Sequence, residues 1–385
     1  MPNKHKIIND PVFGFINVSG RLLDIVRHPY VQRLTRIRQL GLSSYVYPGA
    51  THTRFLHSVG AMHLMNEAIQ QLRRQGHEIT AEEAEGAMAA MLMHDIGHGP
   101  FSHVMENSIV RGISHEEISG LMMRRINADL DGCLTTAIAI FENTYRKRFL
   151  HRLVSSQLDM DRMDYLSRDS FFCGVSEGMI GAARILKMLN VQGDELVVEE
   201  KGIYSVEKFL VARRLMYWQV YLHKTSVGME QMLLHIMMRA KQLAEAGTQL
   251  FASPALSHFL YNKVTSDAFR SDTSLLDLYA LLDDADLTSA IKVWMHHDDR
   301  ILSMLCTAFI NRQPFKSQTL DSMPDGHDIK ALEERLMRKT GIGAQDIHYL
   351  WDMHEVSTDT YHAGEERINI LMKDGSIRDI CDASD

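Results

Sequence analysis

The sequence predicts a mainly α-helical protein, and three observations carry this prediction. Apolar residues recur at helical spacing through most of the chain, strand-like alternation is confined to three short segments, and each of those segments contains turn-forming residues. The three segments predict short β-hairpins near the N-terminus, around residues 195–206 and at the C-terminus. The remainder of the chain is expected to be helical.

The helices and hairpins can be placed from the same periodicity. The helices are expected over residues 22–39, 53–75, 81–96, 114–127 and 206–246, and the region beyond residue 250 is expected to be largely helical. The hairpins are expected to turn at Asn9–Pro11, Lys201–Gly202 and Lys373–Gly375. Ser114 is expected to cap its helix, with Glu117 completing a capping box.

The length of 385 residues suits one large core or two moderate ones. We expect a main domain over residues 1–240, which includes the N-terminal hairpin, and a mostly helical region over residues 241–385 that packs on it. The sequence has no internal repeat and no low-complexity linker.

Composition and charge narrow the functional classes. The net charge of −8 speaks against a broad nucleic-acid surface, although it leaves room for a local basic pocket that binds a small phosphorylated ligand. The chain has neither a run of 18 apolar residues nor a signal-peptide pattern at its start, so we expect a cytoplasmic protein that does not enter a membrane. The four cysteines are widely spaced, which is typical of reduced thiols rather than a disulfide framework.

Residues 93–103, with the sequence MHDIGHGPFSH, predict a metal site. They follow an apolar run at residues 87–93 that is typical of a buried helix, so His94 and Asp95 end that helix before Gly97 and Gly99. A buried carboxylate beside a buried imidazole is costly unless a cation compensates for it. The alternative is an ordinary helix end with solvated polar residues. Histidine density favours the metal site, because eight of the twenty histidines fall within residues 52–115.

Two further helices present polar residues on apolar faces. His57 shares a helical face with Ala61 and Leu64, and Arg54 lies one turn before it. Asp161 takes an apolar position in a pattern that begins at Val154. The alternatives are a satisfied core histidine for His57 and, for the acidic segment, a solvated helix face, which fits Asp159 and Asp164 better than Asp161.

A third stripe lies on the helix expected over residues 206–246. Arg213, Tyr217, Tyr221 and Lys224 recur at helical spacing, which favours a phosphate-binding pocket with aromatic walls over an ordinary packed core. By contrast, the run of four residues from His296 to Asp299 does not predict a metal site, because consecutive helical residues point in different directions.

The motifs together resemble those of a known family. His57, His94–Asp95 and Asp161 complete the ordered set of the HD-domain metal-dependent phosphohydrolases. The wider motifs resemble the deoxynucleoside triphosphate triphosphohydrolases of that family, in the branch of the human enzyme that carries a sterile-alpha-motif domain ahead of its HD domain. These motifs are residues 39–41, 47–50, 54–58, 94–103 and 161–169. The resemblance covers most of residues 6–230 and implies a helical HD-domain core.

The resemblance also implies roles for individual residues. His57, His94, Asp95 and Asp161 would hold one divalent transition metal (manganese, iron, nickel, cobalt or zinc), with Mg²⁺ accompanying the substrate. His98 and His115 would be catalytic, with Glu106 or Glu116 orienting the imidazole. The phosphates would be bound by Arg54, Arg162 and Arg213, and the sugar and base would be surrounded by Gln39, Tyr165, Asp169 and Tyr221. Tyr217 is a further substrate-binding candidate from the stripe of residues 213–224. A homo-oligomer, either a dimer or a tetramer, is also implied.

Four positions depart from the family pattern. Tyr217 and Leu222 stand where these relatives have histidine and glutamine, so the base and sugar preference does not carry over. Arg27 replaces the acidic residue that reads an activating guanine, and Thr35 replaces a phosphate-binding arginine. Activation by the same nucleotide therefore does not carry over either.

The expected activity is hydrolysis of (deoxy)nucleoside triphosphates to nucleoside and tripolyphosphate, by water that the metal activates. An HD-type phosphodiesterase, nucleotidase or nuclease would share the metal site and differ in the surrounding pocket. A nucleotide-sensing or nucleic-acid-binding HD module without turnover is an alternative from another class. The presence of His98 and His115 beside the metal ligands favours an enzyme.

Overall fold

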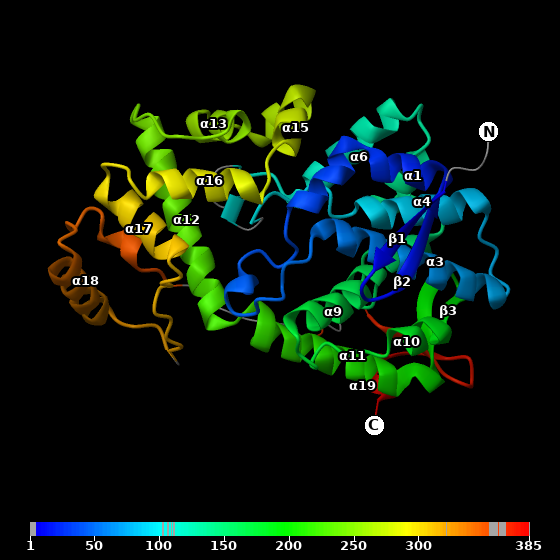
Figure 1. Ribbon diagram of the computed structural model, residues 1–385. Helices are drawn as coiled ribbons and strands as arrows, with labels where there is room; N and C mark the ends of the chain where they lie inside the picture. The colour runs from blue at the N-terminus through cyan, green and yellow to red at the C-terminus, as the bar shows by residue number, and fades with distance from the viewer. Residues whose placement is uncertain are drawn as a thin grey trace.

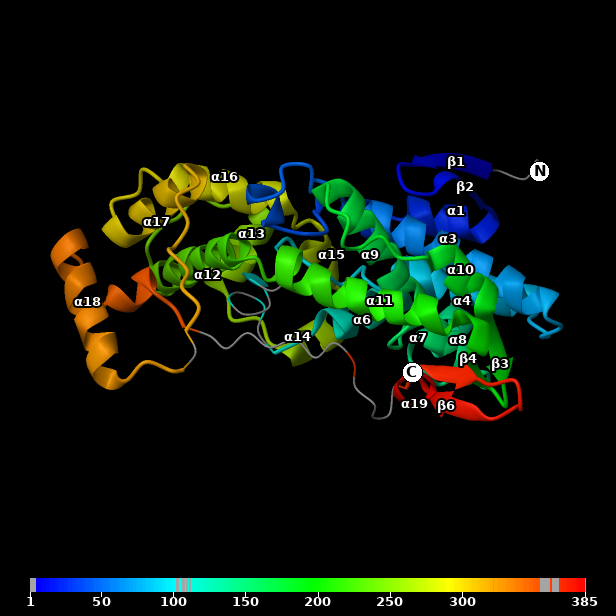
Figure 2. The same cartoon turned by 90° about the horizontal axis from the view of Figure 1, so that it is seen from below.

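The computed structural model describes residues 5–101, 104–105, 108, 110, 112–320, 322–353, 361 and 367–384, and its architecture is mainly helical, as predicted (Figure 1). Two groups of helices lie side by side in both views, and the long helix α12 (Lys224–Glu245) runs through the second group (Figures 1 and 2). Within the described residues, no helix has the length and apolar character that a bilayer span requires.

The first group is built on three helices, α3 (Arg54–Arg74), α4 (Ala81–Met93) and α9 (Met160–Cys173), with α3 packed against both of the others. Residues 89–93 at the end of α4 are buried on all sides, which agrees with the predicted apolar run, although Met88 in that run is only partly buried. Around these three lie α6 (His115–Asp129), α7 (Thr135–Phe141), α8 (Arg148–Val154) and α10 (Ala182–Met188).

The N-terminal hairpin is present as predicted, but the helix expected over residues 22–39 is broken. Strands β1 (His5–Asp10) and β2 (Gly14–Ser19) pair in antiparallel fashion. After them come α1 (Gly20–Arg27), α2 (Pro29–Gln32) and the 3-10 turns η1 (Arg33–Arg36) and η2 (Ser43–Tyr45). The break falls at Pro29, because the residue before a proline is driven out of the helical region.

The second and third hairpins join in one sheet. Its strand order is β3 (Leu189–Gln192), β4 (Glu195–Glu199), β5 (Asn369–Leu371) and β6 (Ile377–Asp379), and β4 pairs with β5 in parallel. The hairpin predicted around residues 195–206 exists, but its turn was placed wrongly. It turns at Gly193–Asp194, while Lys201 and Gly202 lie in the 3-10 turn η3 (Glu200–Gly202).

The helix expected over residues 206–246 is interrupted. It consists of α11 (Ile203–Met216), a π-helical turn η4 (Tyr217–Tyr221) and α12. His223 separates η4 from α12 and caps the latter, because its Nδ1 accepts a hydrogen bond from the Thr225 backbone N–H at 3.2 Å. The predicted stripe from Arg213 to Lys224 therefore does not follow one continuous helix.

The C-terminal region is helical, as expected. It contains α13 (Pro254–Tyr261), α14 (Ser266–Ser271), α15 (Thr273–Ala280), α16 (Asp284–Trp294), α17 (Arg300–Ile310), α18 (Gly326–Thr340), the 3-10 turn η5 (Ile347–Leu350) and α19 (Ile380–Ala383). The division into domains at residue 240 stays a prediction, and Ala240 lies inside α12.

Helix caps differ in part from those predicted. Ser114 caps α6 as expected, with its hydroxyl accepting from the Glu117 backbone N–H, but the Glu117 side chain pairs with Arg270 instead of completing a box. A capping box is found at α4, where Thr80 and Glu83 satisfy each other's backbone N–H groups.

Glu83 is a buried carboxylate, and we predict that it stabilises the fold at neutral pH. Burial alone would raise the pKa of the Glu83 carboxyl, but hydrogen bonds from Lys147, Thr80, Tyr145 and Arg146 lower it to about 2. An unfolded glutamate has a pKa of about 4.3, so the stabilisation is present above about pH 4.3 and is lost as the pH falls through about 2.

The Glu83→Gln variant should therefore lose about 2 kcal/mol of unfolding free energy at pH 7, measured by urea denaturation. The difference in unfolding free energy between Glu83→Gln and the wild type should shrink below about pH 4. Glu85→Gln is the matched control, since Glu85 makes a half-exposed pair with Arg21 that is worth about 0–1 kcal/mol. Equal stability of the two variants would contradict the prediction.

Candidate active site

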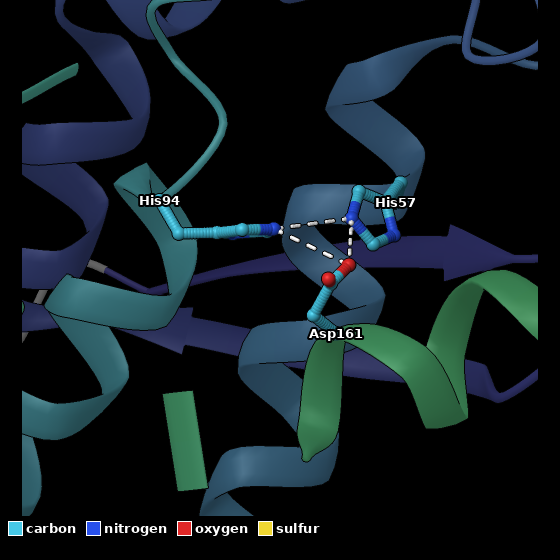
Figure 3. Close-up of side chains that lie close together, drawn as sticks. All are labelled: His57, His94 and Asp161. Atoms are coloured by element: carbon cyan, nitrogen blue, oxygen red, sulfur yellow. Dashed lines mark hydrogen bonds and ion pairs between the residues drawn. The ribbon is translucent and has the colours of Figure 1, made fainter. Parts of the chain in front are cut away.

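Three polar side chains from three helices meet at one place in the core (Figure 3). His57 Nε2 lies 3.1 Å from Asp161 Oδ1, and His94 Nε2 lies 3.4 Å from the same oxygen. The two Nε2 atoms are 3.4 Å apart. The structure thus brings together three of the four residues predicted as metal ligands, with one ligand atom from each converging.

Both imidazoles are held so that Nε2 faces this cluster. His57 Nδ1 donates to Asp164 Oδ2 at 2.8 Å, and His94 Nδ1 donates to the Met91 carbonyl at 2.7 Å. A hydrogen bond from Nδ1 fixes the tautomer and leaves the Nε2 lone pair to act as a ligand.

The electrostatics of the cluster favour a cation. Burial alone would lower the pKa of the His57 imidazole, but hydrogen bonds to Asp161 and Asp164 raise it to about 10. The same histidines outweigh burial at Asp161 and lower the pKa of its carboxyl. Two imidazole nitrogens and a carboxylate oxygen also match the ligand preference of divalent transition metals. The residues present therefore fit such an ion, and the group can hold one.

Asp95, the fourth predicted ligand, lies beside the other three. Its Oδ1 is 3.4 Å from His94 Nε2, and its Oδ2 is 3.7 Å from His57 Nε2. Arg54 Nη1 donates to Oδ2 at 2.7 Å. Against the effect of burial, His94, His98 and Arg54 lower the pKa of this carboxyl well below its usual range, so it is a carboxylate at neutral pH.

The two predicted catalytic histidines lie next to each other. The rings of His98 and His115 stack with their centroids 3.8 Å apart, and His98 Nε2 is 3.4 Å from Asp95 Oδ1. Burial and the nearby Arg54 lower the pKa of His98 to about 3, so its imidazole is neutral at pH 7. Glu116 Oε1 lies 3.1 Å from His115 Nε2, whereas Glu106 falls outside the described residues.

The predicted phosphate-binding arginines are partly buried. The Arg162 side chain pairs with Asp159, and Arg213 Nη1 donates to Gln157 Oε1 at 2.7 Å. Both arginines act electrostatically on Tyr165, as does Asp161. In each arginine the Nε is buried without a hydrogen-bond partner among the described residues, so each guanidinium has capacity for a further acceptor.

The residues predicted around the sugar and base form an aromatic corner. The Tyr221 ring contacts the rings of Tyr165 and Tyr217 edge to face, at centroid distances of 6.0 and 5.2 Å. Asp169 accepts from Tyr221 Oη at 2.9 Å. Gln39 lies next to this corner: its backbone N–H donates to the carbonyl of His52, and the His52 side chain contacts Asp169.

Sequence reasoning missed four residues that shape the site, His52, Asp159, Asp164 and Arg168. His52 Nε2 contacts Asp169 Oδ1 at 2.7 Å, and both side chains are buried. Asp164 holds His57 and is itself held by Arg168. The alternative of a solvated helix face for Asp159 and Asp164 is wrong, since both side chains are fully buried.

The reason for Asp161 facing inward also differs from the one predicted. Val154 ends α8, and α9 begins only at Met160, so Val154 and Asp161 do not share a helix. Asp159 is the N-cap of α9 and accepts from the Arg162 backbone N–H at 2.7 Å. Asp161 therefore reaches the cluster from the first turn of α9.

Comparisons with known protein families agree with this arrangement. A model of the HD domain matches residues 54–169, and a model of an HD associated region matches residues 180–253. The first match begins at Arg54 and ends at Asp169, so it contains all four predicted metal ligands.

Similar proteins extend the match to nearly the whole chain. The crystal structure of a phosphohydrolase from Bacteroides thetaiotaomicron is 55% identical, has a TM-score of 0.96, and is matched over 99% of this chain and 95% of that chain. The uncharacterised protein YwfO of Bacillus subtilis is 32% identical over 98% of this chain and 87% of its own length. The deoxynucleoside triphosphate triphosphohydrolase SAMHD1 homologue of Dictyostelium discoideum is 31% identical over 64% of this chain and only 51% of its own length.

The contact between Asp164 and His57 predicts a role for Asp164 in metal binding. Asp164→Asn should lower the affinity for Mn²⁺ by about 10- to 100-fold, because the carboxylate that orients the ligand and raises its basicity is lost. The affinity is measured by isothermal titration calorimetry, with folding checked by circular dichroism.

Asp129→Asn provides the control for this measurement. Asp129 also contacts a histidine, with its Oδ2 3.3 Å from His28 Nε2, but on the surface. Its substitution should leave the Mn²⁺ affinity unchanged. Equal affinities of the Asp164 and Asp129 variants would show that Asp164 does not support the ligand.

Proposed function

The chain belongs to the HD-domain phosphohydrolases, and from this premise we propose that it hydrolyses deoxynucleoside triphosphates to nucleoside and tripolyphosphate. The observation that carries the proposal is a juxtaposition on α9. Asp161 belongs to the ligand cluster, and the next residue, Arg162, begins a cationic and aromatic surface that includes Arg213 and Tyr165. A triphosphate chain and a nucleoside are the groups that this combination suits.

The arginines support a phosphorylated substrate. Arg54 contacts Asp95 beside the cluster, while Arg162 and Arg213 lie near Tyr165, to which Asp161 is also close. Guanidinium is a permanently charged planar fork that pairs with phosphate oxygens in bidentate fashion. Three guanidinium groups near the ligand cluster suit a chain of phosphates better than a single phosphate.

The aromatic corner supports a nucleoside. Tyr165, Tyr217 and Tyr221 offer ring faces and edges for a base, and Asp169 and Gln39 offer polar groups for a sugar. Gln39 Oε1 is buried and accepts no hydrogen bond from the described residues, so a donor on the substrate would satisfy it.

A divalent cation held by His57, His94, Asp95 and Asp161 would activate water and neutralise charge on the phosphate under attack. The remaining roles belong to the chain itself. Arg54, Arg162 and Arg213 orient the phosphates, so that the bond between the α-phosphorus and the sugar O5′ is the one that breaks. The departing O5′ needs a proton, and we assign its delivery to His115, which Glu116 contacts at 3.1 Å.

The identity of the products tests the function. The protein is incubated with each deoxynucleoside triphosphate and Mn²⁺ in ¹⁸O-labelled water, and the products are identified by ³¹P NMR and mass spectrometry. The expected products are nucleoside and tripolyphosphate, with ¹⁸O in the tripolyphosphate. Pyrophosphate or orthophosphate as the first product, or faster turnover of a simple phosphodiester, would assign the chain to the nucleotidases or phosphodiesterases of the family. Asp95→Ala serves as the inactive control.

Because His115 is proposed as the general acid and not as a metal ligand, its substitution should impair catalysis without loss of the metal. His115→Ala should keep its bound metal, while kcat falls by about 10²- to 10⁴-fold because the general acid is removed. Metal content is measured by elemental analysis and kcat by product formation. His296→Ala, which changes an exposed histidine just after α16, should behave like the wild type. Loss of metal from His115→Ala would make His115 a ligand instead.

Three further properties belong to the same proposal. The metal is manganese, iron, nickel, cobalt or zinc, the active form is a homodimer or homotetramer, and the protein acts in the cytoplasm. The ligand chemistry supports the first, since imidazole and carboxylate suit these ions. The resemblance to the triphosphohydrolases of the family supports the second, and the lack of an 18-residue apolar run in the sequence supports the third.

A further inference from the structure

A buried histidine, His52, contacts the aromatic corner without belonging to the ligand cluster. Its Nε2 lies 2.7 Å from Asp169 Oδ1, and the side chains of both residues are buried. The other oxygen, Asp169 Oδ2, accepts a hydrogen bond from Tyr221 Oη at 2.9 Å. Asp169 thus has one oxygen bound by His52 and the other by Tyr221, so the three side chains form one connected chain.

The imidazole of His52 has one polar contact and one orphan nitrogen. Its ring stacks on Phe172, with the centroids 4.5 Å apart and the planes 19° apart. Its Nδ1 is buried and has no hydrogen-bond partner among the described residues. A buried polar atom without a partner destabilises a fold, and an apolar side chain stacked on Phe172 would avoid that cost. Packing alone therefore does not account for a histidine here, whereas the contact of Nε2 with Asp169 does.

Residues 47–52 pack closely against two elements of the candidate site. A Cβ at Gly49 would lie 2.4 Å from the Phe172 carbonyl oxygen, so only glycine allows this approach to the end of α9. The Tyr47 hydroxyl donates to the Gln219 carbonyl, which belongs to η4. The segment is therefore held against both α9 and η4, and η4 is the turn that contains Tyr221.

The backbone around His52 is fixed without help from the imidazole. The Gln39 backbone N–H donates to the His52 carbonyl at 3.0 Å, and the Arg54 backbone N–H donates to the Ile37 carbonyl at 2.9 Å. These hydrogen bonds hold the segment on both sides of His52. The side chain is thus not required to close the segment, which leaves its contact with Asp169 as its distinct contribution.

Tyr221 is the member of this chain that a substrate can meet. His52 and Asp169 are only 3% and 1% exposed, whereas Tyr221 is half-buried and contacts the rings of Tyr165 and Tyr217. A hydroxyl bound to a carboxylate makes a charge-assisted hydrogen bond, which holds a ring in one orientation more firmly than contacts between rings alone. His52 therefore acts on the corner through Asp169 and Tyr221.

From these contacts we propose that His52 is a positioning residue for nucleoside binding. It holds the Asp169 carboxylate, which in turn holds the Tyr221 hydroxyl, so that the Tyr221 ring keeps one orientation toward the base and sugar. Without the Nε2 donor, one Asp169 oxygen would lose its partner and the carboxylate could turn away from Tyr221. The inference rests on the proposed function, since it takes the aromatic corner as the place of the nucleoside.

Two substitutions of His52 test the role of Nε2. His52→Leu keeps an apolar side chain against Phe172 and removes the donor, whereas the side-chain amide of His52→Gln can donate in place of Nε2. We expect His52→Leu to raise the KM for deoxynucleoside triphosphates by about tenfold, because a hydrogen bond to a charged group is lost. Its kcat should change little, which is the pattern of lost uniform binding, and His52→Gln should restore most of the loss in KM.

Tripolyphosphate is the control ligand, because it carries the phosphates without the nucleoside. Its inhibition constant should be the same for His52→Leu and for the wild type. His235→Leu is the control variant: His235 is also buried and also contacts a phenylalanine ring, that of Phe315, but it lies on α12. An equal rise in KM in His235→Leu, or an equal loss of tripolyphosphate affinity in His52→Leu, would show a merely structural role and overturn the proposal.

Tyr221→Phe tests the path from His52 to the corner. This substitution removes the hydroxyl that Asp169 holds, so adding His52→Leu to it should raise the KM no further. Additive effects of the two substitutions would overturn transmission through Asp169.

Binding measurements separate this inference from the proposed function. The affinities for a deoxynucleoside triphosphate and for tripolyphosphate are measured with Mn²⁺ by isothermal titration calorimetry, in the full chain carrying His115→Ala to slow turnover. If the wild type hydrolyses no triphosphate but His52→Leu weakens binding of the nucleotide alone, the inference holds and the proposed function is refuted. Turnover with an unchanged KM in His52→Leu would overturn the inference and keep the function. No binding of the nucleotide would overturn both.

Discussion

The buried ion pair between Arg168 and Asp164 is the interaction on which the site depends. Arg168 donates to both carboxylate oxygens of Asp164 at 2.9 Å and to Asp10 at 2.7 Å, and all three side chains are fully buried. Asp164 Oδ2 also accepts from His57, so the N-terminal hairpin, α9 and α3 are joined through one guanidinium. Gly60 makes this possible, because a Cβ there would lie 2.0 Å from Arg168 Nη2. Removing one partner of such a pair leaves an uncompensated buried charge, which costs about 3–5 kcal/mol.

The turn after α4 is held from both groups of helices. Arg33 Nη1 donates to the carbonyls of Ile96 and His98 at 2.8 Å, and Tyr279, on α15, donates to the Gly97 carbonyl at 3.0 Å. Gly97 lets α6 approach this turn, since a Cβ there would lie 2.1 Å from the His115 carbonyl. The stacking of His115 on His98 follows from that approach. Gly97, in the turn after α4, thus also sets the distance between the predicted metal ligands and the proposed acid.

The sequence was most informative for residues whose burial follows from the periodicity of a single helix. The apolar run before His94, and the shared face of His57, Ala61 and Leu64, correctly predicted that both histidines face the core, because burial on a single helix follows periodicity. Periodicity could not distinguish Asp164 from a solvated residue, since an Asp–Arg pair at i,i+4 has the same spacing on a surface and in a core. Nor could it show that α9 begins anew at Met160, because residues 155–159 are ordered by Asp159 capping and not by local propensity.

The predicted substrate-binding stripe over residues 213–224 departs from helical periodicity for a different reason. Residues 217–221 form a π-helical turn, and such turns are frequent at functional sites because they change which way the following side chains point. In this chain the turn brings Tyr217 and Tyr221 together at an angle of 84° and gives Tyr221 a contact with Asp169. Lys224 lies beyond the break at His223, so the cationic end of the stripe does not extend this corner as a continuous helix would. Under the proposed function, selectivity for base and sugar would therefore depend on this irregular segment. Tyr217, in the π-helical turn, and Leu222, directly after it, are two of the four positions that depart from the family pattern.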